Sequence, residues 1–522
     1  MSADPNYIYW DAIVVGAGIG GLSAAARLVQ AGLRVLVVEK NHHPGGTAYV
    51  YKRKGFTFPM GPLGFSSPAL IKKHLSDLGQ PNELHLSRVH YQIRAFGLQV
   101  LLSRPFGLLV EDLSRVFPDD VGGMTRFFQD MGRMLLAIHS PELEDNRMLL
   151  EKTKGTSARA YLESLVGDWR LRRLLGSLGT REPYGNIPLM AAMWNLMSTE
   201  GIWYPSGGMR SLCDSLARVV ATKREDTGGI GEIRLGVKVK EIRVRHGQAE
   251  GILLEDGTMI DGKRIISNAD FKTTFVRLLG PHAVLDPWYR AIVRAKLTGS
   301  VFQVCLGVDS SRVDLSAFSE ASRLIYRKSR NGSGLVSEEM DWAAAEVTGK
   351  ALAAQELEVS LISRDDPTLV PERGSVIVVR TEADYGHFLK CRSSEQRREA
   401  GYNEYKRRLA TALIRETGNI IPGLEEAVLV MDIASPLTFE DQGGRSEGAV
   451  AGWSWDYEDA LDYVPVELIR TPVRGLYMAG HQAYSALFMG GVPAALESGA
   501  RAAEYLLQGA GPVEDMRIPG GC

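Results

Sequence analysis

The sequence predicts an α/β fold that begins with a Rossmann-type unit. Three observations predict it: a short apolar strand at residues 11–15, a glycine-rich turn at 16–21, and a second apolar strand at 35–38. Residues 22–31, between the turn and the second strand, have the composition of a helix. Strand, turn and helix in this order, followed about 20 residues on by the carboxylate of Glu39, form the fingerprint of dinucleotide binding.

Three positions of the turn require glycine for a physical reason. Gly16 permits the tight turn, Gly18 lets the backbone approach a pyrophosphate, and Gly21 lets the helix pack closely on the strand. Free N–H groups and the helix dipole then face the phosphates. The other candidates for contact in this turn are Ile19 and Gly20.

Glu39 closes the second strand, where it can accept hydrogen bonds from ribose hydroxyls. A carboxylate here would repel a 2′-phosphate, which argues against NADP. FAD and NAD remain open at this point, because the same unit serves both.

Length and composition exclude several classes of protein. The 522 residues are too many for one simple core, so we expect two or more domains. The formal net charge is −2, which makes nucleic acid an unlikely partner. No Cys/His pair has the short spacing of a zinc site, so no metal is expected.

The sequence predicts a cytoplasmic protein. The four cysteines lie far apart, which fits a reducing compartment, and the first residues lack the pattern of a secretory signal. No apolar run reaches the ~18 residues that span a bilayer. Residues 94–110 come nearest, and they fit either a membrane-facing surface element or a buried segment. Any membrane contact is therefore expected to be peripheral.

Six further segments resemble one flavoprotein family. They are KNHHPGGT at 40–47, GFTFPMGP at 55–62, YPSGGM at 204–209, IISNAD at 265–270, GLYMAGH at 475–481 and FMGGVPA at 488–494. In this order they resemble the group of phytoene desaturases, carotenoid isomerases and retinol saturases within the amine oxidase superfamily. Pro59 replaces an aspartate that is usual in the second segment, and His481 stands where many members carry Asp or Ala.

The resemblance implies FAD as the cofactor and adds contacts to those of the turn. Residues 233–244 are predicted to form one strand, and Val239 within it matches a residue that contacts adenine through its backbone, with Val237 as the second choice. The helix that starts near residue 491 would face the flavin ring, where its dipole suits a negative charge. The other implied cofactor residues are Lys40, Gly45, Gly46, Thr47, Gly61, Gly480, His481, Gly491 and Val492.

The resemblance also implies how the chain is divided. A discontinuous FAD-binding domain of the glutathione-reductase-like type would comprise residues 8–70, 200–285 and 432–508. An inserted α+β substrate domain would comprise 71–199 and 286–431, with a mainly helical first piece.

The implied chemistry is desaturation of a C–C bond, or saturation or isomerisation of a double bond, in a hydrophobic isoprenoid- or carotenoid-like substrate. Hydride transfer at flavin N5 would carry the redox step. The segment GGIG at 228–231 is expected to be a loop or turn before a strand, and no second dinucleotide fingerprint follows a strand. Electrons would therefore pass to or from a quinone, oxygen or a reductase. Two alternatives stay open: an amine-oxidase-type enzyme acting on a small polar substrate, and a prenyl-lipid-binding flavoprotein without catalysis.

Three residues are candidates for catalysis. Arg181 and Glu182 interrupt an apolar stretch and could form an acid/base pair, although a solvated surface ion pair is the commoner outcome. His481 is the third, because of its place beside the implied flavin site.

Overall fold

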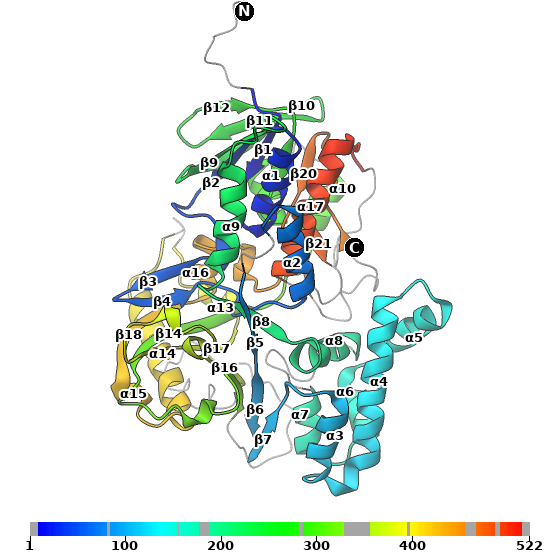
Figure 1. Ribbon diagram of the computed structural model, residues 1–522, viewed down its shortest axis with the longest axis vertical. Helices are drawn as coiled ribbons and strands as arrows, with labels where there is room; N and C mark the ends of the chain where they lie inside the picture. The colour runs from blue at the N-terminus through cyan, green and yellow to red at the C-terminus, as the bar shows by residue number, and fades with distance from the viewer. Residues whose placement is uncertain are drawn as a thin grey trace, which may run out of the picture.

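The computed structural model describes residues 9–80, 84–154, 156–176, 187–280, 286–327, 355–393, 397–454, 466–485 and 491–513. Three regions make up the molecule (Figure 1). A parallel sheet with helices lies at the top, a larger mixed sheet at the lower left, and a lobe of helices at the lower right.

The parallel sheet has five strands in the order β20-β13-β1-β2-β9. The chain enters it at β1, crosses through α1 to β2, and later adds the three remaining strands. Every pairing in it is parallel, as in β1 and β2, where Val15 lies beside Val38. The bounds are β1 Ala12–Val15, α1 Ile19–Gln30, β2 Arg34–Glu39, β9 Ile230–Leu235, β13 Ile265–Ser267 and β20 Leu476–Met478. The predicted Rossmann-type α/β fold is thereby confirmed.

The run from 233 to 244, predicted as one strand, is two. β9 ends at Leu235, and Gly236 turns the chain with a φ of +70° before β10 (Val239–Arg245) begins. β10 then joins β11 (Gln248–Leu254) and β12 (Met259–Asp261) in a separate antiparallel sheet. β9 itself begins at Ile230, inside a stretch expected to be a turn, and its Gly231 lets the strand lie against the backbone of Val220.

The mixed sheet has seven strands in the order β18-β14-β17-β16-β15-β6-β7. One face packs on α14 (Tyr402–Gly418), where Val304 and Leu306 share a buried cluster with Leu409 and Leu413. The opposite face meets the hairpin of β3 and β4, since Gln303 donates to the carbonyl of Pro59. The strands are β3 Val50–Arg53, β4 Phe56–Pro59, β6 Tyr91–Ala95, β7 Leu98–Leu101, β14 Ser300–Asp309, β15 Arg323–Arg327, β16 Leu357–Leu361, β17 Gly374–Ala383 and β18 Val428–Ala434.

The helical lobe packs around large apolar side chains. Phe127, Phe128 and Trp194 form edge-to-face pairs in its centre. Its helices are α3 Phe106–Ser114, α4 Val121–His139, α5 Glu144–Lys154, α6 Ala158–Leu165, α7 Trp169–Gly176 and α8 Ile187–Met197.

Residues 94–110, for which a surface element and a buried segment were both open, divide into three parts. They contain the end of β6, the whole of β7 and the start of α3. β6 and β7 form a hairpin, and β6 pairs with β15, so the first half of the segment is the edge of the mixed sheet.

Further helices and short strands connect these regions. They are α2 Pro68–Asp77, β5 Leu86–Val89, β8 Ile202–Pro205, α9 Arg210–Ala221, α10 Asp286–Arg294, α12 Ile362–Asp365, α13 Tyr385–Leu389, α15 Leu424–Ala427, α16 Pro436–Asp441, β19 Val466–Glu467, β21 Tyr484–Ser485 and α17 Val492–Gln508. None of the helices in the described ranges has both the length and the hydropathy needed to cross a bilayer. Within the same ranges, no three His, Cys, Asp or Glu side chains are grouped so as to hold a metal ion.

Candidate cofactor site

A cavity of about 1110 Å³ lies where the parallel strands end. Its walls include the last residues of β1 and β2, the residues after β13 and β20, and the start of α17. The carboxyl edge of a parallel sheet is where open α/β folds bind ligands. Fourteen of the residues predicted to contact the cofactor line it: Gly16, Gly18, Ile19, Gly20, Glu39, Lys40, Gly45, Gly46, Thr47, Val239, Gly480, His481, Gly491 and Val492.

The glycine-rich turn presents bare backbone to this cavity. Gly16 has a φ of +97°, which an L side chain rarely adopts. A Cβ on Gly20 would lie 2.6 Å from the amide nitrogen of Gly480, so only glycine lets these two loops meet. Gly45 donates its N–H to the carbonyl of Ala17 at 2.7 Å, which holds the second glycine pair beside the first turn.

Glu39 is buried, with 5% of its surface exposed, yet its carboxylate faces the cavity. One oxygen accepts the N–H of Ala17 at 2.8 Å and the other accepts the N–H of Asn41 at 2.9 Å. A carboxylate has about four acceptor positions, so two remain for hydroxyl donors in the cavity.

Gly21 and Gly61, both predicted to contact the cofactor, do not line the cavity. A Cβ on Gly21 would come closer than 3.0 Å to the backbone oxygen of Gly16, so this glycine serves helix packing. A Cβ on Gly61 would lie 2.6 Å from the carbonyl oxygen of Thr47. Its own carbonyl accepts a hydrogen bond from Arg380, so Gly61 supports the wall from behind.

Val239 and Val237 both line the cavity near Glu39, so both candidates for the adenine contact are present. Val237 donates its N–H to the carbonyl of Glu39 at 2.9 Å. The bend at Gly236 therefore brings both valines to the ends of the parallel strands.

The residues after β20 form the other end of the site. Gly480 donates its N–H to Ser498 of α17 at 2.8 Å, which fixes this loop to the helix. Burial, helped by the positive charge of Arg445, lowers the pKa of His481 to about 3. The imidazole is therefore neutral at pH 7 and cannot act there as a cationic acid.

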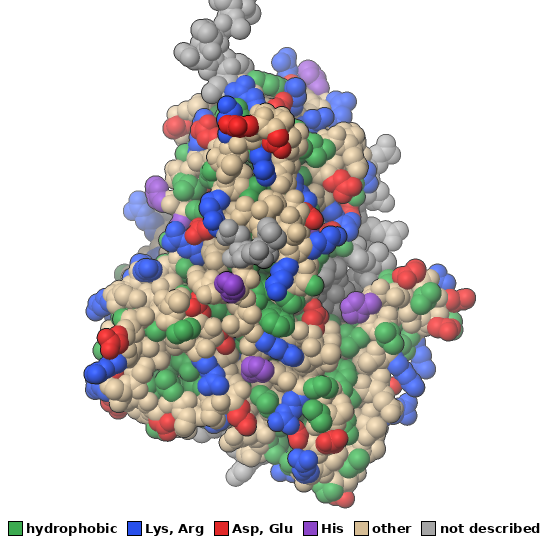
Figure 2. Space-filling view, in the orientation of Figure 1, with side chains coloured by type: hydrophobic (Ala, Val, Ile, Leu, Met, Phe, Trp, Pro, Cys, Tyr) green, Lys and Arg blue, Asp and Glu red, His purple; other side chains and the backbone are tan. Residues whose placement is uncertain are grey.

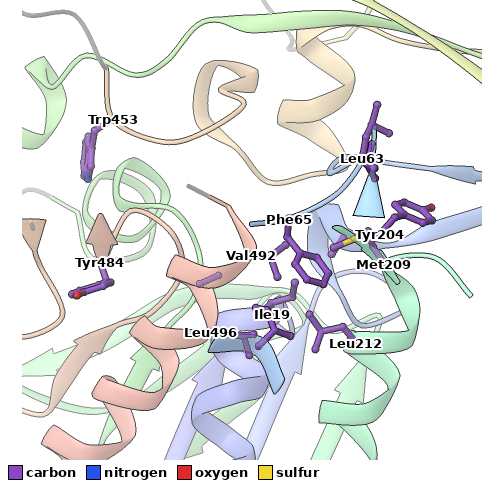
Figure 3. Packing of buried hydrophobic residues seen from close by; sticks show 14 of the residues in the cluster. Ile19, Leu63, Phe65, Tyr204, Met209, Leu212, Trp453, Tyr484, Val492 and Leu496 are labelled. Carbon is purple, nitrogen blue, oxygen red and sulfur yellow. The ribbon is translucent and has the colours of Figure 1, made fainter. Parts of the chain in front are cut away.

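Apolar side chains surround the start of α17. Val492 lies beside Ile19, Phe65 and Leu496, all of them buried, while Trp453 stands farther off (Figure 3). The site is consequently polar where the turn and Glu39 meet it and apolar around Val492.

Several cavity residues were missed by sequence reasoning. Asn268 follows β13, and a Cβ on Gly20 would lie 2.7 Å from its side-chain oxygen. Asn268 and Asp270 belong to the IISNAD segment at 265–270, so the family motif is the signal that could have identified them. The others carry no motif: Thr273, Arg277, Tyr385, Arg392, Glu440, Asp441, Arg445 and Ser446.

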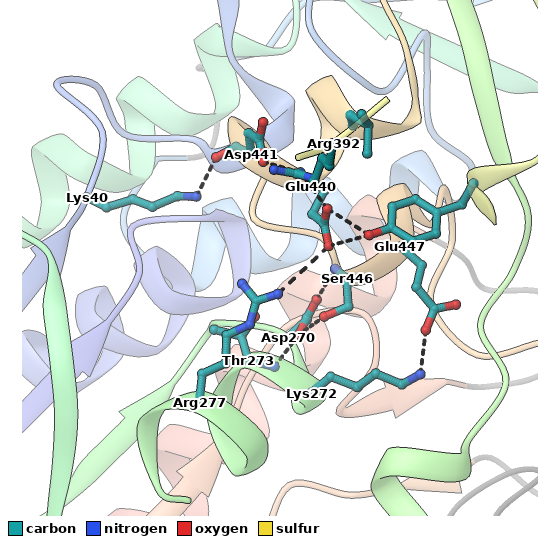
Figure 4. A network of polar contacts seen from close by, with 12 residues as sticks. Lys40, Asp270, Lys272, Thr273, Arg277, Arg392, Glu440, Asp441, Ser446 and Glu447 are labelled. Carbon is teal, nitrogen blue, oxygen red and sulfur yellow. Dashed lines mark hydrogen bonds and ion pairs between the residues drawn. The ribbon is translucent and has the colours of Figure 1, made fainter. Parts of the chain in front are cut away.

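These missed residues form a polar network that crosses the cavity wall (Figure 4). Arg392 pairs with Glu440 at 2.7 Å and with Asp441 at 2.5 Å. Arg277 reaches Glu440 from the other side at 3.8 Å, and Lys40 donates to the backbone carbonyl of Asp441 at 2.9 Å. The network joins α16 to β2 and to the segment after β13.

Arg181 and Glu182 lie outside the described residues. The proposed acid/base pair therefore stays a prediction.

The cavity suits a dinucleotide in size and in chemistry. Ligand pockets commonly measure about 300–1000 Å³, and this one is at the upper limit. The exposed turn at the start of α1 supplies backbone donors for phosphates, and Glu39 supplies acceptors for hydroxyls.

The chain is similar in sequence to several known proteins. The chain is 26% identical over 516 residues to a prolycopene isomerase of Daucus carota, covering 91% of this chain and 77% of that protein. It is 26% identical to a lycopene-forming phytoene desaturase of Pseudescherichia vulneris over 58% of this chain and 64% of that one. It is also 25% identical to an inactive all-trans-retinol 13,14-reductase of Danio rerio, over 92% and 83% of the two chains.

Solved structures share the fold. An oxidoreductase of Methanosarcina mazei matches with a TM-score of 0.63 at 18% identity, covering 94% of this chain and 99% of that one. A putrescine oxidase variant matches with a TM-score of 0.63 at 16% identity, covering 96% and 99%. The model of the family of flavin containing amine oxidoreductases matches residues 19–419. The chain therefore belongs to this family and is an FAD-dependent oxidoreductase.

Proposed function

We propose that this enzyme acts on a carbon–carbon bond of a hydrophobic, isoprenoid- or carotenoid-like substrate, by desaturation, saturation or isomerisation. The observation that carries the proposal is the similarity, over 91% of the chain, to a prolycopene isomerase. A desaturase and a protein related to retinol reductases among the other relatives support the same substrate class.

The surroundings of Val492 support an apolar substrate. Bound flavin supplies the hydride chemistry at its N5 atom. The protein contributes an apolar lining through Ile19 and Val492, with Phe65 and Leu496 buried beside them, and this lining excludes water. His481 is neutral there and adds no charge that would have to be desolvated beside a polyene.

We assign the polar part of the cavity to the adenosine and pyrophosphate of FAD. The backbone donors of Gly18 to Gly20 would hold the pyrophosphate, and Glu39 would accept from the ribose. Val239 would contact adenine, and the start of α17 at Gly491 and Val492 would face the flavin ring.

A polar amine is the less favoured substrate. The solved amine oxidases are 15–16% identical, a level at which they support the fold alone. An aromatic cage for an amine would use Tyr484, but the guanidinium of Arg501 lies 4.5 Å from the centre of that ring and covers one of its faces. The third possibility, a protein that binds FAD without catalysis, is addressed by the reduction experiment below.

Electrons have to come from or go to an external partner, for which we propose a quinone, oxygen or a reductase. In the described part of the chain, the parallel sheet with its glycine turn is the one unit of the dinucleotide-binding kind. Stopped-flow reoxidation of the reduced enzyme by a water-soluble quinone and by oxygen would rank the candidates by rate.

We propose further that the helical lobe contacts a lipid surface from which the substrate is drawn. Large apolar side chains stand in solvent on this lobe, among them Leu136 at 69% exposure and Met148 at 63%. Arg133 lies near Leu136 on α4 and pairs with Asp130 at 3.8 Å, and hydrophobic, basic and acidic side chains all appear on the lower right of Figure 2. Apolar side chains exposed on helices are typical of proteins that lie on membranes.

Sedimentation with vesicles that contain anionic phospholipid tests the lipid contact. The double variant L136E/M148E should bind several-fold less. M259E is the matched control, because Met259 is 67% exposed on β12, at the opposite end of the molecule. Equal sedimentation of both variants would contradict the proposal that the helical lobe contacts lipid.

An anaerobic absorbance spectrum tests the main proposal. The purified protein should show oxidised-flavin bands that bleach with dithionite. A polyene or prenyl lipid added in detergent should then bleach the oxidised form if the enzyme is a desaturase, or restore the oxidised bands if it is a saturase. Product chromatography with no net redox change would identify an isomerase. A flavin that responds to dithionite but to no polyene would disprove the proposed substrate class.

A further inference from the structure

One cation of the cofactor cavity differs from the others. Arg445 lines the cavity and donates to the hydroxyl of Thr47 at 2.8 Å. Its other terminal nitrogen donates to the backbone carbonyls of Ala449 at 3.2 Å and Val450 at 2.5 Å. All three partners are neutral, so these bonds orient the guanidinium without neutralising it.

The remaining cations of the wall have other arrangements. Arg392 and Arg277 pair with Glu440, and Lys238 pairs with Glu255 at 2.5 Å. Lys40 donates to a backbone carbonyl, as Arg445 does, but Lys40 and Lys240 are both exposed to water. For Arg445, by contrast, no carboxylate oxygen of the described residues lies within 4.0 Å of its nitrogen atoms.

The carboxylate that attracts Arg445 already accepts three other hydrogen bonds. Asp270 accepts the backbone N–H and the hydroxyl of Ser446, the latter at 2.9 Å, and also the N–H of Thr273 at 2.7 Å. These bonds hold the loop that carries Arg445 in place. They leave Asp270 attracting Arg445 only through space, and burial still lowers the pKa of the guanidinium to about 10.

A partly buried cation that faces a ligand cavity without a carboxylate in direct contact is costly unless an anion binds beside it. Arg445 is placed between Thr47, next to the glycine pair Gly45 and Gly46, and His481, whose protonation its charge opposes. FAD is the anion that this cavity takes, since it carries a diphosphate and acquires further negative charge when the ring is reduced.

We propose that Arg445 is a cofactor-binding residue, whose guanidinium neutralises an anionic oxygen of FAD, on the diphosphate or on the reduced ring. This inference rests on the assignment of the cavity to FAD. It locates the positive charge of the site on a loop that lies far along the chain from the dinucleotide fingerprint.

Binding and redox titrations of the full chain test this inference. R445Q removes the charge while keeping donors for Thr47, and R445K keeps the charge but loses the planar fork. R474Q is the matched control, because Arg474 is exposed and donates to the carbonyl of His246, outside the cavity. Dissociation constants for FAD and for ADP are measured on each apoprotein, and midpoint potentials on each flavin-loaded protein.

If the partner is the diphosphate, we expect R445Q to weaken FAD ~10–100-fold, the usual range for one charge-assisted hydrogen bond. R445K should lie between R445Q and the native protein, and R474Q should match the native protein. If the partner is the diphosphate, ADP weakens in parallel and the potential stays constant. If it is the reduced ring, ADP binding is unchanged and the potential falls ~30 mV for each tenfold preference lost.

Either pattern supports the role of Arg445 and locates its partner. Native affinities for FAD and ADP together with a native potential in R445Q would overturn it. If R445Q does not fold, R445K gives the same comparison. A native protein that takes up no FAD would instead refute the assignment of the cavity, which is a different failure.

Discussion

The two walls of the candidate cofactor cavity are built in different ways. The N-terminal wall, residues 15–48, is one continuous stretch whose contacts are made by backbone, as in the bond from Gly45 to Ala17. The facing wall comprises residues 268–277, 385–392 and 440–446, which are joined by side chains such as Arg392 with Glu440. Hydrogen bonds between backbone groups follow from local geometry, whereas ion pairs depend on charges that the fold brings together. The first wall should therefore be most sensitive to added volume and to loss of its single carboxylate, Glu39, whereas loss of a charge in the second wall should act locally.

A methyl group inside the N-terminal wall should have the largest effect. The Cβ of G21A would meet the backbone oxygen of Gly16 at less than 3.0 Å, so α1 has to move away from β1. We expect a loss of about 3 kcal/mol in the free energy of unfolding and failure to retain FAD, measured by urea unfolding and absorbance. G122A is the control, because no described residue lies within 4 Å of the Cβ it would add on α4, and it should be neutral or slightly stabilising. Equal stability of both variants would show that the helix tolerates displacement.

Removing one charge from the N-terminal wall should have the next largest effect. E39Q keeps the size of the side chain but replaces one acceptor oxygen by a donor, which then opposes the N–H of Ala17 or Asn41. The dissociation constant for FAD should rise ~10–100-fold, as measured by fluorescence quenching. E232Q on β9 serves as the control, since Glu232 lies outside the cavity and pairs with Arg234. An unchanged affinity of E39Q would remove Glu39 from the ribose site.

A change in the facing wall should be milder and more local. D270N weakens the bonds to Ser446 and Thr273, at a cost of about 1–2 kcal/mol in the free energy of unfolding. Hydrogen exchange should become faster in residues 440–450, while the N-terminal wall keeps the native rates. Faster exchange in both walls would mean that they open as one unit, contrary to the comparison drawn here.

The smallest effect is expected when low pH protonates a carboxylate on α17, the helix that borders both walls. The hydrogen bond from His74, together with Arg501, lowers the pKa of Glu497 on α17 to about 2 from its ordinary value of 4.5. A carboxyl with a lowered pKa stabilises the folded state above pH ~4.5, and this stabilisation is lost as the pH falls toward ~2. E497Q should be less stable at neutral pH by on the order of 1 kcal/mol, and the difference should vanish near pH 2. A difference that persists unchanged through this range would exclude Glu497 as the titrating group.

Much of the N-terminal wall could be predicted from its sequence. The strands at 11–15 and 35–38, the turn and Glu39 lie within a single stretch of about 30 residues, and their patterns need no distant partner. The prediction of one strand at 233–244 was wrong because it also relied on a local pattern. The apolar content of this run predicts a strand, but Gly236 at φ +70° divides the run between two sheets. A local pattern does not say which neighbour a strand will find.

By itself, the sequence determined the α/β class, the dinucleotide fingerprint and the resemblance that pointed to FAD, because these depend on spacing along the chain. The tertiary structure decided that Gly21 and Gly61 stand behind the cavity and that Arg445 reaches Thr47 from nearly 400 positions away. Among the described residues, it also left Arg445 without a carboxylate in direct contact, while Glu440 and Asp441 pair with Arg392. The physical reason is that electrostatic compensation depends on distances in space, which only the packed chain defines.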